Sequence, residues 1–94
     1  MPELAPDTVL RRAADAVHAD VDGLVVMLDL DAGSYYGLNE VGTHIWGLLA
    51  EPRTLDAVAA DLHRSYEVEE AEAREAARAF LAELVERGVV EPVA

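Results

Sequence analysis

The stretch from Val25 to Trp46 joins two short apolar runs, a turn and the start of a helical pattern, so it limits the fold more than any other part of the chain. The first run ends in Asp-Leu-Asp-Ala-Gly, and two adjacent tyrosines open the second. Asn39 then precedes the helical pattern, as a helix N-cap does. The stretch predicts a β-hairpin that leads into a helix. If the second strand of this hairpin lies at a sheet edge, its unpaired N–H and C=O groups form a template for an extended peptide.

A third strand is expected before this hairpin, because a lone two-stranded hairpin is marginal in water. We predict antiparallel strands over about 14–21, 24–30 and 34–38. Asp22-Gly23 and Gly33 supply the turn residues between them. Residues 9–17 would also suit a short helix, although the alternation that follows favours the strand. Side chains alternate between the two faces of the second strand, with Leu24, Val26, Leu28 and Leu30 on one face and Val25 and Met27 on the other.

Three helices are predicted after the sheet, over about 40–50, 55–66 and 69–87. Pro52 ends the first, Thr54 caps the second and Gly88 ends the third. Residues 1–13 begin with two prolines and have no clear period, so we expect a flexible N-terminal arm and a single folded domain over 14–94. The predicted fold class is α+β, with a three-stranded antiparallel sheet followed by three helices.

Composition excludes several classes of function. Nineteen acidic residues face seven basic ones, all arginine, and the net charge of −12 repels the phosphates of nucleic acids. The chain has no cysteine, which excludes disulfides, thiolate catalysis and Cys-ligated zinc. No apolar run approaches the ~18 residues of a membrane span, and no secretory signal opens the chain. We therefore expect a cytoplasmic protein that contacts neither nucleic acid nor membrane.

Catalytic and cofactor motifs are not found in the sequence either. His18, His44 and His63 lie at separations that match no metal-binding motif. Ser34 and Ser65 stand in no nucleophile setting, and the glycines form no phosphate loop. We expect no enzyme activity, no metal and no cofactor.

The adjacent Tyr35 and Tyr36 allow two interpretations. Such a pair in a strand usually consists of one core residue and one half-exposed residue. The alternative is that one ring forms the wall of a pocket for a partner's side chain. The second interpretation agrees with a peptide-binding strand.

Arg74 and Arg78 lie one turn apart on the third predicted helix and also allow two interpretations. They could simply pair with Glu70 and Glu75 on the same helix. Alternatively, they could form a basic and apolar strip beside the exposed strand, which would suit a peptide with acidic and bulky residues. The acidic residues of this helix would repel a DNA backbone, which disfavours a helix-turn-helix reader.

Residues 28–46, from Leu-Asp-Leu-Asp-Ala-Gly-Ser-Tyr-Tyr-Gly through Asn-Glu-Val-Gly-Thr-His-Ile-Trp, resemble the signature of the PqqD-like family. The run Phe-Leu-Ala-Glu-Leu-Val-Glu-Arg-Gly-Val-Val at 80–90 resembles the closing helix of that family. The resemblance covers about residues 15–92, and the hairpin is its more specific half. Within the family, the Tyr-Tyr-Gly-Leu-Asn-Glu-Val-Gly form is most similar to the stand-alone recognition proteins of split lasso-peptide leader peptidases.

This resemblance implies a winged helix-turn-helix-like fold, called a RiPP recognition element, that binds rather than catalyses. The leader of a ribosomally synthesised precursor, here of a lasso peptide, would add as a strand to the third strand and lie against the third helix. It would then be presented to a separate cysteine leader peptidase and to a cyclase. Carried onto this chain, the peptide-binding residues are Val26, Leu28, Leu30, Ser34, Tyr35, Tyr36, Gly37, Leu38, Arg74, Ala77, Arg78, Leu81 and Val85.

Two alternatives to this function stay open. A PqqD-type chaperone would have the same fold but would serve a radical SAM modification enzyme. A winged-helix transcription regulator would belong to another class, and it would need salt-dependent binding to duplex DNA. In each case we expect a monomer or a weak dimer that pairs through the exposed sheet edge.

Overall fold

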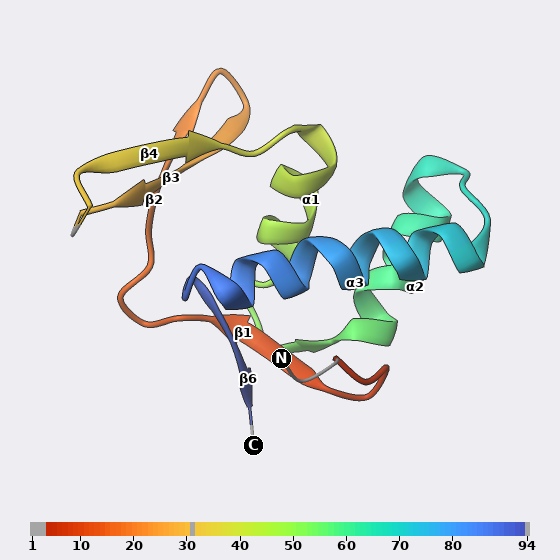
Figure 1. The fold of residues 1–94 in the computed structure, drawn as a ribbon. Coiled ribbons are helices and arrows are strands. Elements are labelled where there is room, and N and C mark those ends of the chain that lie inside the picture. The colour runs from red at the N-terminus through yellow and green to blue at the C-terminus, as the bar shows by residue number, and fades with distance from the viewer. Residues whose placement is uncertain (1–3, 31, 94) are drawn as a thin grey trace.

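Two small antiparallel sheets and three helices make up the part of the chain that the computed structural model describes, residues 4–30 and 32–93 (Figure 1). The elements in chain order are β1 (Val9–Arg12), β2 (Val17–Val21), β3 (Leu24–Asp29), β4 (Ser34–Gly37), α1 (Glu40–Leu48), β5 (Arg53–Thr54), α2 (Leu55–Tyr66), α3 (Glu70–Glu86) and β6 (Val90–Val93). None of the described helices is both long enough and apolar enough to cross a membrane.

The first sheet confirms the predicted hairpin and its preceding strand. Its strand order is β2-β3-β4, and all neighbours are antiparallel. Asp22 and Gly23 turn the chain between β2 and β3 with φ angles of 53° and 86°, and Gly33 has φ 68° before β4. These left-handed conformations explain why glycine stands at two of the three positions. Asp31 of the predicted loop lies outside the described residues.

Helix caps place the three helices close to their predicted bounds. The Asn39 side chain accepts a hydrogen bond of 2.8 Å from the Gly42 N–H, which starts α1 directly after β4. Thr54 caps α2 in the same way through the Ala57 N–H, at 3.0 Å. Gly88, with φ 80°, follows the end of α3. The α+β fold with three predicted helices is therefore confirmed.

The N-terminal segment corrects one expectation. Residues 9–13 were expected in a flexible arm, but Val9–Arg12 forms β1, which pairs with β5 on one side and β6 on the other. Leu10 in this strand is 0% exposed, and the Ala13 N–H donates to the Val89 carbonyl at 2.9 Å. The segment is ordered by strands that lie far away in sequence. The predicted first strand is correspondingly shorter and begins at Val17 rather than at residue 14.

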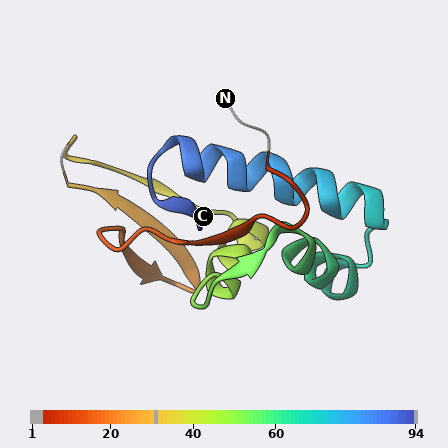
Figure 2. The same cartoon turned by 90° about the horizontal axis from the view of Figure 1, so that it is seen from below.

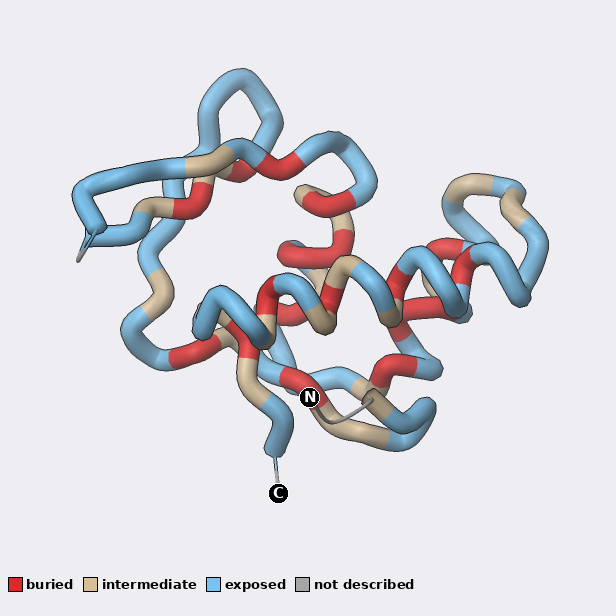
Figure 3. Tube along the Cα trace, viewed as in Figure 1, coloured by how far each residue is buried: buried red, intermediate tan, exposed pale blue. Residues whose placement is uncertain are grey.

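The core lies between the two sheets and the helices, as the buried segments of Figure 3 show. Trp46 of α1 is among its largest fully buried side chains. Arg12 of β1 covers the Trp46 ring, with its guanidinium carbon 4.5 Å from the ring centroid, and donates to the Trp46 carbonyl at 2.6 Å. His18 of β2 meets the same ring edge-on at 5.6 Å. One indole therefore connects β1 and β2 to α1.

Candidate functional site

The strand β4 has a free edge, because the sheet order β2-β3-β4 places it at one border of its sheet. The Leu38 N–H donates to the Val25 carbonyl at 2.8 Å, so residue 38 faces β3 with its backbone groups. Successive residues of an antiparallel strand alternate in this respect. Tyr35 and Gly37 must therefore point their N–H and C=O groups away from β3. Four backbone hydrogen-bonding groups stand along this edge with no strand opposite them in the described part of the chain.

The C-terminal half of α3 lies on the inner side of β4. Arg87, which caps α3, holds its guanidinium carbon 4.3 Å from the centroid of the Tyr36 ring. Glu83 fixes this guanidinium with a hydrogen bond of 3.2 Å. One turn earlier, Phe80 lies so close to Gly42 at the start of α1 that a Cβ there would be 3.0 Å from the ring. Figure 2 shows β4 running toward this end of α3. A stripe of α3 thus faces the strand and the first turn of α1.

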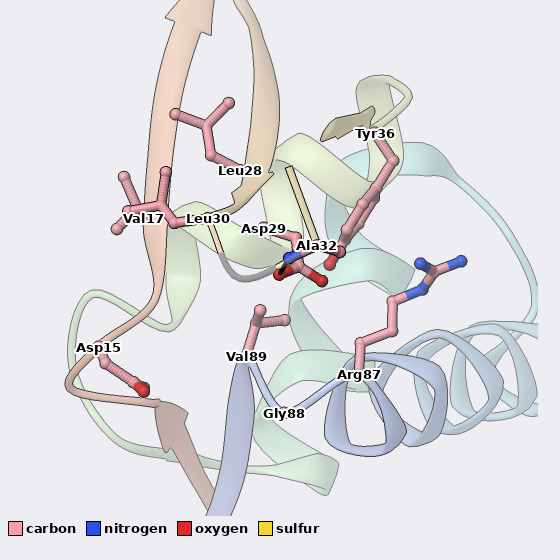
Figure 4. A pocket seen from close by; sticks show the side chains of 10 residues that line it. All are labelled: Asp15, Val17, Leu28, Asp29, Leu30, Ala32, Tyr36, Arg87, Gly88 and Val89. Carbon is pink, nitrogen blue, oxygen red and sulfur yellow. Dashed lines mark hydrogen bonds between the residues drawn. The ribbon is translucent and has the colours of Figure 1, made fainter. Parts of the chain in front are cut away.

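A pocket of about 520 Å³ opens between the β3–β4 turn and the end of α3 (Figure 4). It is lined by Asp15, Val17, Leu28, Asp29, Leu30, Ala32, Tyr36, Arg87, Gly88 and Val89. The side chains of Tyr36 and Arg87 form one wall, and apolar side chains from β2 and β3 form the other. The pocket therefore combines apolar walls with one guanidinium and two carboxylates, a lining suited to a side chain of a bound peptide.

The hydroxyl of Tyr36 in this wall is buried and has no hydrogen-bond partner among the described residues. Burial raises the pKa of Tyr36 above its ordinary value, and the nearby Arg87 cation opposes that rise. A buried hydroxyl without a partner is costly, so it marks a place where a bound group could supply the missing hydrogen bond.

The predicted site residues of the sheet fall on both of its faces. Val26, Leu28, Leu30, Tyr35 and Gly37 belong to the outer face, because they alternate with residues that face the core. Ser34, Tyr36 and Leu38 belong to the inner face, where Tyr36 is half-buried and Leu38 is part of the core. Of these residues, Tyr35 and Gly37 point their backbone groups to the free edge of β4, and the Tyr36 ring lines the pocket.

The predicted site residues of α3 lie in the core or form ion pairs. Ala77 and Leu81 are fully buried in the core, and Val85 packs against it. Arg74 pairs with Asp56 of α2 at 3.2 Å and with Glu70 of its own helix at 3.7 Å. Arg78 pairs with Glu75 on its own helix. The pairs with Glu70 and Glu75 are those of the first interpretation, and contact of these arginines with a peptide stays a prediction.

At the end of α3, Glu83 and the capping Arg87 lie near Tyr36 of β4, while Phe80 packs against Gly42 of α1. None of these three was among the predicted site residues. Arg78 and Glu83 are five residues apart, so they lie about 140° apart around the helix. The sequence contains a signal for this side of α3, because residues 80, 83 and 87 recur at helical spacing. No cluster of metal-ligating side chains occurs within residues 4–30 and 32–93.

The family model for coenzyme PQQ synthesis protein D (PqqD) matches residues 24–90. The chain belongs to the PqqD family. A comparison with curated proteins found no match. Among solved structures, TbiB1 in complex with the TbiA(beta) leader peptide is 31% identical, with a TM-score of 0.79 over 89% of this chain and 98% of that one. Lasso peptide synthetase B1 complexed with the leader peptide is 30% identical, with a TM-score of 0.77 over 88% of this chain and 98% of that one.

A more distant PqqD relative shares the fold. The PqqD part of PqqCD from Methylobacterium extorquens, solved in solution as a stand-alone RiPP recognition element, is 18% identical. It superposes with a TM-score of 0.76 over 94% of both chains. The expected recognition-element fold, with its three-stranded antiparallel sheet and three helices, is therefore confirmed for this PqqD-family chain.

Proposed function

We propose that this chain binds the leader segment of a ribosomally synthesised precursor, of the lasso-peptide class, by adding it as a strand to β4 against α3. The observation that carries the proposal is the free edge of β4, where Tyr35 and Gly37 offer four unpaired backbone groups. Support comes from the two similar proteins whose structures contain leader peptides. Identities of 31% and 30% to these, against 18% to the PqqCD domain, favour a lasso-peptide leader over the substrate of a radical SAM enzyme.

The affinity of such a complex can be bounded from its parts. Four edge hydrogen bonds contribute about 0.5–1.5 kcal/mol each, and one or two buried apolar anchors add about 1.5–3 kcal/mol each. Ordering a flexible leader takes back several kcal/mol of this. We expect a dissociation constant between about 10 nM and 10 μM, and a value weaker than about 100 μM for the cognate leader would contradict strand addition.

The enzymatic steps would belong to other proteins. We infer that the bound leader is presented to a separate cysteine leader peptidase and then to a cyclase. The support is geometric: β4 has four residues, so a longer leader extends beyond the strand and stays accessible at both ends. In this arrangement the chain supplies recognition, and the partner enzymes supply cleavage and ring closure.

The variant Gly37→Pro tests strand addition directly. Proline has no backbone N–H, so this variant lacks the N–H of residue 37 that points away from β3. Proline is tolerated at a sheet edge where the N–H has no partner in the sheet. We expect binding of a lasso-peptide leader to weaken at least about tenfold, the equivalent of 1.4 kcal/mol. The measurement is isothermal titration calorimetry, with amide-exchange NMR to locate protection along Ser34–Gly37.

The matched control is Asp20→Pro on β2, the opposite edge of the same sheet. Residue 20 also points its N–H away from β3, because the backbone groups of Val26 and Leu28 face β2 on that side. Its leader affinity should stay within about twofold of the unsubstituted chain, well below the 1.4 kcal/mol of a tenfold change. Equal losses in both variants would show that β4 is not the docking edge.

A further inference from the structure

The outer face of the β2-β3-β4 sheet is apolar throughout. Strand alternation and register place a single set of side chains on it, and these are Val17, Val21, Leu24, Val26, Leu28 and Tyr35, with Ala19 and Gly37 between them. Val21 is 52% exposed and Tyr35 is 76% exposed. Apart from the Tyr35 hydroxyl, no strand residue on this face carries a polar side chain. We call this surface the outer sheet face.

Carboxylates outnumber cations around this face. Residues 13–52 contain no lysine or arginine, and their acids are Asp15, Asp20, Asp22, Asp29, Asp31, Glu40 and Glu51. Figure 4 shows Val17, Leu28 and Leu30 on one side of the pocket, with Asp29 close to Leu30 and Asp15 farther away below Val17. Within the described residues, none of the ion pairs involves an acid of this segment. Arg12 interacts electrostatically with Asp20, and Arg87 lines the pocket beside Asp29, but the carboxylates outnumber these two cations. The outer sheet face is therefore an apolar surface with a rim of net negative charge.

A second copy of the chain does not fit this surface well. Two copies stacked face to face would bring their acidic rims together, and like charges across an interface are unfavourable. The face is also small, because three strands of about five residues cover roughly 16 Å by 14 Å. A stable interface buries about 800 Å² on each partner. The occupant must therefore carry positive charge and contact more than the bare sheet.

The face adjoins the leader-binding edge. Tyr35 contributes its side chain to the outer sheet face and its backbone groups to the free edge of β4. A peptide added to β4 would place every second side chain on this same face. It would widen the apolar surface by one strand, about 5 Å. The complete docking surface would thus exist only while a leader is bound.

We propose that the outer sheet face, extended by the bound leader, is the docking surface for a protein partner with an apolar centre and a rim of lysine and arginine. This docking surface rests on the proposed function. We assign its partner as the peptidase that cleaves the leader. The peptidase would contact sheet and leader side chains together, so the negative rim would select the partner and the bound strand would signal that substrate is present.

The variant Val21→Lys tests the proposal. Val21 pairs with Leu24 at the side of the sheet opposite β4, so the change leaves the leader edge untouched. The probe is a leader-cleaving cysteine peptidase of a lasso-peptide pathway, titrated into the complex of this protein with a leader peptide. We expect the substitution to weaken peptidase association at least about tenfold while leader affinity stays within about twofold.

The matched control is Val93→Lys, because Val93 is 37% exposed but lies in the other sheet, paired with Val9. It should leave both affinities unchanged. The variant Val21→Glu tests the charge of the partner's rim and should lose less peptidase affinity than Val21→Lys. Equal losses for Glu and Lys would overturn the basic rim, and unchanged peptidase affinity in Val21→Lys would overturn the docking face.

Three further outcomes separate the proposals from one another. Failure of the unsubstituted chain to bind the leader in calorimetry would overturn the proposed function itself. Dimerisation of the unsubstituted chain in sedimentation analysis, lost in Val21→Lys, would assign the face to a second copy and overturn the partner proposed here. Leader binding without any peptidase association would overturn only the docking surface.

Discussion

Tyr36 combines a stacked ring with a hydroxyl that has no partner among the described residues. Since an unsatisfied buried hydroxyl costs about 1–3 kcal/mol, Tyr36→Phe should raise the free energy of unfolding of the free protein by about 1 kcal/mol. If a bound leader supplies the missing partner, the same variant should bind the leader more weakly. Thermal unfolding with and without leader measures both effects.

The control for this prediction is the neighbouring Tyr35→Phe, whose hydroxyl belongs to an exposed side chain and should change neither quantity. The raised pKa of Tyr36 adds a pH signature. Because the fold disfavours the ionised phenol, stability should fall as the pH rises through the ordinary tyrosine value of about 10. Tyr36→Phe should lose that part of the pH dependence, and a profile identical to the unsubstituted chain would contradict the assignment.

Helices α1 and α2 are joined by a polar contact centred on Asp61. His44 Nε2 of α1 lies 2.6 Å from Asp61 Oδ1, and the Ser65 hydroxyl donates to the same oxygen at 3.1 Å. The His44 hydrogen bond is the main reason why the pKa of Asp61 lies below its ordinary value. A lowered carboxyl pKa stabilises the fold above the unfolded value of about 4, and that stabilisation is lost as the pH falls through the folded value.

Asp61→Asn should therefore lower the free energy of unfolding by about 1 kcal/mol near pH 7. The difference from the unsubstituted chain should narrow below about pH 4, because the Asp61 carboxylate takes up a proton in the unfolded chain at a higher pH than in the folded protein. Urea denaturation at pH 7 and pH 3 measures both values. The control is Asp22→Asn, which should leave the free energy of unfolding unchanged at both pH values. Asp22 lies at an exposed turn position with a left-handed φ of 53°, a conformation that asparagine also adopts.

The helices and the hairpin could be predicted from the sequence because their signals are local. Thr54 and a 3.6-residue period give both ends of α2, and Gly33 gives the turn before β4. The side of α3 that faces β4 was not predictable in the same way. Arg78 and Arg87 both lie beside the apolar stripe of this helix, and the packing of α3 against β4 and α1 decides which of them reaches the strand.

The strand β1 could not be predicted for a different reason. Its partners are β5 and β6, and its contact between Arg11 and Glu91 joins residues 80 positions apart. A four-residue strand with a buried leucine and two arginines has no clear alternation of its own. Sheet pairing at such separation depends on the completed fold rather than on local propensity.

The β1–β6 pairing holds Leu10 in the core, so a substitution of Leu10 tests how much this strand contributes to stability. Leu10→Ala should lower the free energy of unfolding by about 2–4 kcal/mol, because the side chain is fully buried and its removal leaves a cavity. Leu30→Ala is the matched control, since Leu30 is 73% exposed, and it should change stability by less than about 0.5 kcal/mol. Chemical denaturation followed by tryptophan fluorescence measures the stability of both variants. An unchanged free energy of unfolding in Leu10→Ala would favour a flexible N-terminal arm over an ordered β1.

The pairing of Val9 with Val93 brings the two ends of the described fold into one small sheet. Figure 1 shows this sheet on one side of α3 and β4 on the other. A linker joined at either end would therefore start away from the peptide edge. Fusing an enzyme there would raise its effective concentration at a bound leader into roughly the millimolar range, provided that the linker can span α3. The same β1–β6 pairing that buries Leu10 thus makes the domain suited to covalent tethering.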